Sequence, residues 1–264
     1  MLVDDGAGFG RIPLASRTSK PRGKGITMMV EWGLPLGMQE DLLELTGSVI
    51  DIAKVAVGIS GLLEERLLAR KIGLYREHDV EPFPGGMYLE YAFAKDEVEA
   101  YFDGCEKAGY HYVEVSDNAV PLKRGEKDSL IARARSRGFT VLGEAGSKRV
   151  TTNAAALVED VQACLDAGCW KVFLEAAELF EEGKFRHDVF ERVAHDVKAE
   201  DVIWELPGAW IPNVHAHEIH ALEVWLLERV GADVNIANVP TDGLLSLEAL
   251  RRGVGVRALM DGGE

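Results

Sequence analysis

The chain has 264 residues, of which 47% are hydrophobic and 28% charged, so it is long enough for one large domain with an extensive core. Acidic residues outnumber basic ones by 44 to 29, and the formal charge of −15 disfavours binding to nucleic acids and anionic membranes. No run of about 18 apolar residues occurs, so no membrane-spanning helix is expected.

The N-terminal stretch and the cysteines indicate a cytoplasmic protein. Residues 1–18 contain no apolar core of a secretory signal and are expected to form a mobile leader before a folded domain of residues 19–264. The cysteines, Cys105, Cys164 and Cys169, are odd in number and lack the spacing of a disulfide framework, which favours reduced thiols in the cytoplasm.

From residue 25 onward, short β-branched segments typical of strands alternate with amphipathic segments typical of helices. One helical segment spans residues 153–168, and Asn153 and Gly168 are residue types that begin and end helices. Eight strands that alternate with helices predict an α/β protein with a single (β/α)8 TIM barrel. The segments expected as strands are residues 26–32, 51–60, 80–86, 110–117, 139–146, 170–177, 202–208 and 233–239.

A polar residue recurs once in each of several consecutive strand–helix units. At intervals of 30 or 31 residues stand Glu114, Glu144, Glu175, Glu205 and Asn235, and Lys54 lies 60 residues before the first of them. Because the interval matches one strand–helix unit, these residues are expected at equivalent positions around the barrel. Inward-facing residues at the carboxyl ends of barrel strands form the floor of the active site, where we expect this ring of polar side chains.

Four glutamates within strands require an explanation, because an isolated buried carboxylate costs several kcal/mol. One interpretation is structural: Lys54 or Lys171 could neutralise a glutamate inside the barrel. The other is that the carboxylates hold a divalent cation or a strongly bound cationic group, which an excess of negative charge in one cavity favours. We favour the second interpretation, because four acids and a lysine share one predicted depth.

Further residues follow the predicted strands at the same end of the barrel. Ser116 and Asp117 come after the fourth strand, and Gly85 and Gly86 end the third, where glycine permits close approach of a ligand to the backbone. Lys148 follows the fifth strand. A lysine among carboxylates stays protonated and suits a proton donor or an anion anchor, although this one could also be an ordinary solvated loop residue.

Histidines cluster at the start of the predicted seventh helix, at His215, His217 and His220. The last two would share a helix face and the first two would not, so zinc binding is one interpretation. We favour an entry loop whose histidines, His215 among them, contact substrate or solvent. The neighbouring Trp204 and Trp210 are expected to pack in the interior, with a position over the mouth as the alternative for Trp210.

Several stretches resemble the phosphosulfolactate synthase family of coenzyme M biosynthesis. They run in the same order from about Ser19 to near the C-terminus, and the last contains Asn235 and Asn238. These stretches are KPRGKGITMMVEWG, DIAKVAVGIS, FPGGMYLE, VEVSDN, GEAGSK and NIANVPTDGLLSLEALRRG. The chain is therefore identified as a divergent member of that family.

The resemblance implies a magnesium-dependent (β/α)8 barrel that adds sulfite to phosphoenolpyruvate. It implies that Mg²⁺, or Mn²⁺ in its place, stabilises the enolate charge. Lys148 would then protonate the neighbouring carbon, and Lys54 would anchor a carboxylate or sulfonate. The metal ligands would be Glu144 and Glu175 first and Glu114 and Glu205 next. From their positions after the predicted strands, the substrate contacts are expected to come from Ser116, Asp117, Gly85, Gly86, Asn235, Asn238 and His215.

Two segments depart from the family pattern. LEAAELFEEG follows the sixth strand where the family carries a glycine- and arginine-containing segment, and GAWIPNVHAHEIH follows the seventh strand where the family has a short lysine-containing turn. Arginine is the preferred bidentate partner of phosphate and sulfite, so its loss predicts a different acceptor, a different nucleophile, or both.

Other interpretations stay open from the sequence alone. An aldolase with an imine on Lys148 or Lys54 needs a strongly lowered lysine pKa, which surrounding carboxylates oppose. A barrel that has lost catalysis and binds a ligand is the non-enzymatic alternative. The protein is also expected to form a homo-oligomer if Trp225 and Leu226 of the segment 221–231 face outward rather than toward the barrel.

Overall fold

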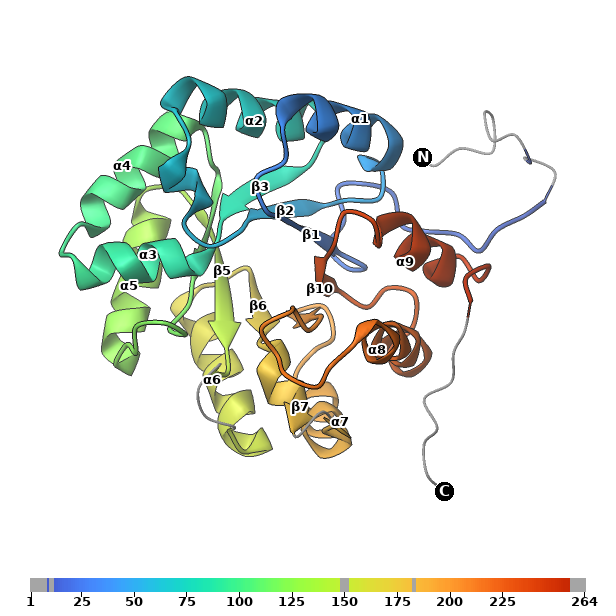
Figure 1. Cartoon of the computed structure of the whole chain (residues 1–264). Coiled ribbons are helices and arrows are strands. Elements are labelled where there is room, and N and C mark those ends of the chain that lie inside the picture. Colours follow the sequence, from blue (N-terminus) through green and yellow to red (C-terminus); the bar gives the residue numbers. More distant parts are fainter. Residues whose placement is uncertain (1–8, 10–11, 148–151, 182–183, 257–264) are drawn as a thin grey trace.

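The computed structural model describes residue 9 and residues 12–147, 152–181 and 184–256 of the chain. Within these ranges the predicted TIM barrel is confirmed: parallel strands form the centre and helices surround them (Figure 1). Lys148 lies outside the described residues. None of the described helices is long and apolar enough to cross a membrane.

The barrel strands follow the predicted segments closely. They are β1 (Thr27–Glu31), β2 (Ile52–Val55), β3 (Glu81–Pro84), β4 (Tyr112–Val115), β5 (Thr140–Ala145), β6 (Lys171–Leu174), β9 (Val202–Glu205) and β10 (Ile236–Val239). Hydrogen bonds join them in the order β3-β2-β1-β10-β9-β6-β5-β4, and β3 packs next to β4 to complete the ring. A short hairpin of β7 (Phe180–Glu181) and β8 (Lys184–Phe185) was not predicted.

The second strand is shorter than its predicted segment of residues 51–60. After Val55 the chain turns through Val57, whose φ of 47° is incompatible with an extended strand, into the short helix η1 (Ile59–Leu62). The apolar run therefore covers both the strand and the loop above it, and residue type alone does not separate the two.

The helices lie on the outside of the strand ring (Figure 1). Asn153 caps α6 by accepting a hydrogen bond from the N–H of Ala156, and Gly168 ends this helix with a left-handed φ of 103°, as predicted. The α-helices are α1 (Leu36–Thr46), α2 (Glu65–Glu77), α3 (Gly86–Ala94), α4 (Val98–Ala108), α5 (Arg124–Ser136), α6 (Ala154–Ala167), α7 (His187–Asp196), α8 (Ala216–Arg229) and α9 (Leu244–Arg251), and a second short helix is η2 (Ala176–Leu179).

A small apolar core fills the barrel below its mouth. Its members come from the barrel strands, with Ile26 just before β1, and are Ile26, Met28, Ile52, Phe83, Leu142, Phe173, Ile203 and Ala237. The rings of Phe83 and Phe173 stack with centroids 5.8 Å apart. The barrel is therefore closed by packed side chains, and polar groups are confined to its two ends.

Asn235 lies at the amino end of the strands, and its predicted place at the mouth is wrong. Its side-chain oxygen accepts from the N–H of Ile26 at 2.9 Å, and its amide donates to backbone carbonyls that precede and begin β9. The strand register pairs Glu205 with Ala237, two residues beyond Asn235. The strand–helix unit between β9 and β10 is thus two residues longer than the 30-residue repeat. Counting 30 residues from Glu205 therefore reached Asn235 instead of a residue at the mouth.

The segment before residue 19 differs from the predicted leader where it is described. Arg17 is nearly buried, and its guanidinium pairs with Glu248 at 3.1 Å and donates to the carbonyl of Gly25. The N–H of Ala15 donates to the carbonyl of Arg252. Residues 15–18 therefore pack against the barrel rather than preceding it as a free leader.

The side chains considered for an oligomer contact differ in burial: Leu226 is internal and Trp225 is partly buried. Leu226 is fully buried, and the ring of Trp225 packs against Phe185 and Phe190, with centroids 4.7 and 4.1 Å away. Leu226 is therefore unavailable for a contact and Trp225 offers only part of its surface, so self-association stays a prediction. The described cysteines are buried and free, as expected of reduced thiols.

Replacement of Asn235 by alanine is expected to lower the free energy of unfolding by about 2–3 kcal/mol, because a buried N–H and several buried carbonyls lose their partner. Urea denaturation followed by circular dichroism measures this change. Ligand and metal binding at the opposite end should stay unchanged, and an unaltered unfolding midpoint would contradict the structural role.

Candidate metal and substrate site

A cavity of about 450 Å³ opens at the carboxyl ends of the barrel strands. Seven of the predicted site residues line it: Lys54, Gly85, Gly86, Glu114, Glu144, Glu205 and Asn238. The remaining lining residues are apolar and comprise Val30, Trp32, Ala56, Val57, Met87 and Trp210. The cavity therefore has a charged floor at the depth predicted from the repeat and an apolar wall around it.

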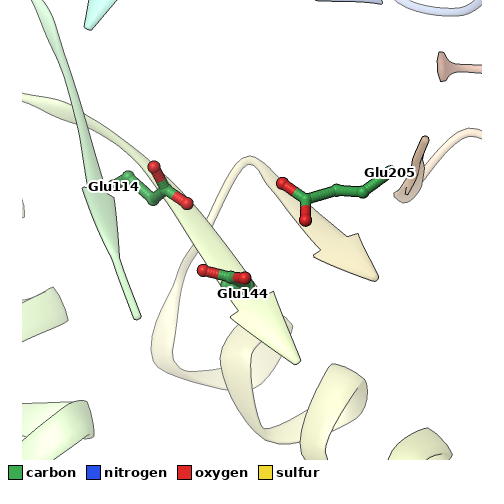
Figure 2. Close-up of side chains that lie close together, drawn as sticks. All are labelled: Glu114, Glu144 and Glu205. Atoms are coloured by element: carbon green, nitrogen blue, oxygen red, sulfur yellow. The ribbon is translucent and has the colours of Figure 1, made fainter. Parts of the chain in front are cut away.

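Three carboxylates converge on one point of the floor. Glu114 extends from β4, Glu144 from β5 and Glu205 from β9, and Figure 2 shows their carboxylates directed toward one another. One oxygen of each lies within 4.8 Å of the others, and all three residues are buried. Carboxylate oxygens brought this close on separate strands form a donor set that suits a hard divalent cation such as Mg²⁺ or Mn²⁺.

Lys54 of β2 joins two of these glutamates. Its Nζ lies 3.1 Å from Oε1 of Glu114 and 3.0 Å from Oε1 of Glu205. The same ammonium lies 4.7 Å from the ring centroid of Phe173 and 5.9 Å from that of Phe83, so it stands directly on the apolar core. Lys54 therefore neutralises part of the charge of Glu114 and Glu205, as the structural interpretation predicted. The three glutamates nevertheless converge as the cation-binding interpretation predicted.

Burial raises the pKa of the Glu114 carboxyl, and the nearby carboxylates of Glu144 and Glu205 raise that pKa further. Lys54 and the N–H of Gly86, which donates to Oε2 of Glu114 at 2.8 Å, act in the opposite direction. The described lining residues thus hold three carboxyl groups against one ammonium. A bound divalent cation would remove the repulsion that this arrangement creates.

Glu175 was predicted among the first metal ligands, but the structure does not bring it into the glutamate group. It follows β6 directly, is fully buried, and its Oε1 accepts from the N–H of Ala177 as the cap of η2. Because a capping carboxylate bends toward its own helix, Glu175 serves the local turn although its sequence spacing matches that of Glu144 and Glu205.

The predicted substrate contacts of Ser116 and Asp117 lie away from this cavity. Ser116 is buried behind Gly86, where a Cβ added to the glycine would meet its hydroxyl, and that hydroxyl donates to Glu90. Asp117 pairs with Nζ of Lys127 at 3.0 Å and lines a separate cavity over α5 and α6. The chain turns outward after β4, so residues adjacent in sequence to Glu114 leave its site.

The three histidines do not gather at one point of the described structure. His215 precedes α8, is exposed and is not among the residues that line the cavity, so its contact with substrate stays a prediction. His217 contacts its neighbour Glu218, and His220 contacts Glu223 and the carbonyl of Val256. The rings of His215 and His217 stack with centroids 6.3 Å apart, and no group of three possible metal ligands among the described residues includes a histidine.

Other buried glutamates, which the repeat did not reveal, hold the loops around the mouth. Glu31 accepts from the N–H groups of Gly33 and Leu34 at 2.7 and 2.8 Å, and Lys71 balances its charge at 3.1 Å. Glu178 accepts from the N–H of Ser147 at 2.9 Å and from the N–H and hydroxyl of Thr152. Each carboxylate thereby fixes a segment that borders the cavity or follows β5.

Glu90 of α3 plays the same part for the loop after β4. It accepts backbone N–H groups from Asn118 at 3.0 Å, Ala119 and Val120, besides the hydroxyl of Ser116. The sequence signal for such a residue is weak, because an acid within a helix is ordinarily a solvent-facing residue and only its burial distinguishes it.

The sequence and fold have relatives among known proteins. The family model for (2R)-phospho-3-sulfolactate synthase (ComA) matches residues 15–256. Phosphosulfolactate synthase of Methanothermobacter thermautotrophicus is 32% identical over 90% of this chain and 92% of its own length, and that of Methanocaldococcus jannaschii is 31% identical over 88% and 92%. The 3-dehydroquinate dehydratase of Aquifex aeolicus shares the fold, with a TM-score of 0.54, 9% identity, and coverage of 85% of this chain and 97% of that one.

Replacement of Glu90 by alanine would remove the acceptor of three backbone N–H groups. Amide hydrogen exchange of residues 118–120 should accelerate by roughly 10- to 100-fold, because each buried group left unpaired costs about 1–3 kcal/mol. Mass spectrometry of the exchanged peptide measures this rate. The exposed acid Glu99 provides the control: Glu99→Ala should leave these amides unchanged, and equal exchange in both variants would refute the anchoring role.

Proposed function

The chain belongs to the phosphosulfolactate synthase family, and from this premise we propose that it is an enzyme that adds a nucleophile to an unsaturated acid. Sulfite and phosphoenolpyruvate are the first reactants to consider, because they are the substrates that the family resemblance implies. The convergence of Glu114, Glu144 and Glu205 beside Lys54 carries this proposal, since it provides an ion site and a cation in one cavity.

The glutamate cluster suits Mg²⁺ as the cofactor, with Mn²⁺ as an alternative, because hard oxygen donors come from three strands. Bound there, the ion would supply electrostatic stabilisation of the negative charge that develops on the substrate carboxylate during addition. Glu114, Glu144 and Glu205 would hold it, and the fixed strand ends give these carboxylates their positions without movement of a loop.

Lys54 would orient the acid over the cavity floor. Its ammonium is held by Glu114 and Glu205 at the edge of the glutamate group, so a substrate carboxylate or sulfonate that reaches the floor meets a fixed positive charge. Gly85 and Gly86 line the same side of the cavity, where a substrate would approach their backbone. Lys148 remains the proposed proton donor on sequence grounds.

The contacts of Lys54 disfavour imine chemistry. A lysine that forms an imine must be neutral, whereas the two carboxylates at 3.0–3.1 Å stabilise its ammonium form. Conjugate addition needs only the charged form, which these contacts supply. The site therefore supports the addition reaction better than an aldolase mechanism through Lys54.

Calorimetric titration with MgCl2 tests the ion site. The protein should bind Mg²⁺, and Glu144→Gln or Glu205→Gln should weaken the affinity by at least about tenfold through loss of a negative ligand. Glu175→Gln is the matched control: it removes the same charge from a buried glutamate outside the cluster and should leave the affinity close to that of the natural protein. Equal weakening by all three variants, or no binding at all, would contradict the assignment.

Incubation with Mg²⁺, phosphoenolpyruvate and sulfite tests the reaction. Mass spectrometry should detect the addition product, and the Glu144→Gln variant should form it at a rate reduced by at least about tenfold. Borohydride in the presence of a carbonyl substrate provides the counter-test, because covalent trapping on lysine would favour the aldolase. Product formation that is unaffected by removal of the metal would rule out the ion-assisted mechanism.

A further inference from the structure

Two tryptophans stand together at the mouth of the cavity. Trp32 follows β1 and Trp210 follows β9, and both line the cavity above the glutamates. Their ring centroids are 6.2 Å apart with the planes inclined by 57°. The residues are 56% and 44% exposed, so much apolar ring surface faces the opening. Trp204, in contrast, is buried as predicted and packs on Phe190.

The backbone turn beside Trp32 and the ring of Trp210 each have defined partners. The turn that carries Trp32 is fixed on one side by Glu31, whose carboxylate binds the N–H groups of Gly33 and Leu34. The ring of Trp210 folds back over Gly208 so closely that a Cβ at this glycine would lie 2.1 Å from ring carbons. The aromatic pair is therefore a positioned wall of the cavity, and Gly208 is the residue that makes room for one half of it.

The cavity divides into two chemically different parts. The floor carries Glu114, Glu144, Glu205 and Lys54, and the wall carries the tryptophan pair together with Val30, Ala56, Val57 and Met87. Gly85, Gly86 and Asn238 complete the lining. Among the described residues that line it, Lys54 is the sole cation, and its ammonium is already bound by two glutamates. Such a wall offers hydrophobic contact and ring stacking rather than partners for a second anionic group.

We propose that Trp32 and Trp210 determine substrate choice by selecting an acid with an aromatic or similarly large apolar substituent. The acid group would lie at the floor, and the substituent would lie against the two rings. This inference rests on the proposed function, because it assumes that the carboxylate end binds beside Lys54 and the ion site. It adds the class of substrate that the wall accepts.

Phenylpyruvate and pyruvate provide a matched pair of probes, since they share a 2-oxo acid group and differ by one phenyl ring. In calorimetric titrations with saturating Mg²⁺, phenylpyruvate should bind at least about tenfold more tightly, which corresponds to about 1.4 kcal/mol. Trp32→Ala and Trp210→Ala should each remove most of this difference and leave the affinity for pyruvate unchanged.

Gly208→Ala gives an independent variant that keeps both aromatic rings. The added methyl group must displace the ring of Trp210, so this variant should also lose most of the preference for phenylpyruvate. Leu45→Ala is the control, because Leu45 is an exposed apolar residue of α1 that does not line the cavity. It should keep the full preference, and circular dichroism should show the same fold for all variants.

The outcomes separate this inference from the proposed function. Normal Mg²⁺ binding with no preference for phenylpyruvate, or with a preference that the Trp32 and Trp210 variants retain, would overturn the aromatic selection alone. Absence of Mg²⁺ binding in the natural protein would instead overturn the proposed ion site. A preference that disappears in the tryptophan variants and in Gly208→Ala, while these variants still bind Mg²⁺, would support the selection.

Discussion

Burial of negative charge is the constraint on which the mouth of this barrel depends. A carboxylate removed from water costs several kcal/mol unless cations or hydrogen-bond donors surround it, and the structure places such partners around each class of buried glutamate. Glu31 and Glu90 receive backbone N–H groups, and Lys54 lies between Glu114 and Glu205. The two groups of glutamates therefore differ in their partners. Those that anchor loops accept backbone N–H groups, and Glu114 and Glu205, which converge over the core, share the ammonium of Lys54.

The division of the buried glutamates into loop anchors and converging side chains makes the site rigid. The converging glutamates extend from strands whose inward neighbours form the packed core, and Lys54 rests on the rings of Phe83 and Phe173. The loops above are fixed by carboxylates at their bases, Glu31 and Glu90 among them. A site held by strands below and by anchored loops above requires little reorganisation when a ligand binds, which is the condition for electrostatic stabilisation in catalysis.

The floor and the wall of the cavity differ in chemical character and come from different parts of the barrel. The floor brings Glu114, Glu144, Glu205 and Lys54 together, whereas the wall is formed by Trp32, Met87 and Trp210. Barrel enzymes change specificity through the loops that follow their strands while the strands keep the chemistry. Trp32 and Trp210 stand in loops of this kind, after β1 and β9.

The sequence by itself determined the barrel, the strand segments, and the inward placement of Lys54, Glu114, Glu144 and Glu205, because alternation and repeat length are local properties of the chain. Which polar residue of the last strand reaches the mouth depends on strand register and loop length, so Asn238 lines the cavity while Asn235 binds backbone groups at the other end. Only the tertiary structure decided that Glu175 caps a turn, that Glu31, Glu90 and Glu178 anchor loops, and that Trp32 meets Trp210. Those roles depend on groups that are distant in sequence or on the direction of a side chain. Neither of these produces a regular spacing in the sequence from which it could be predicted.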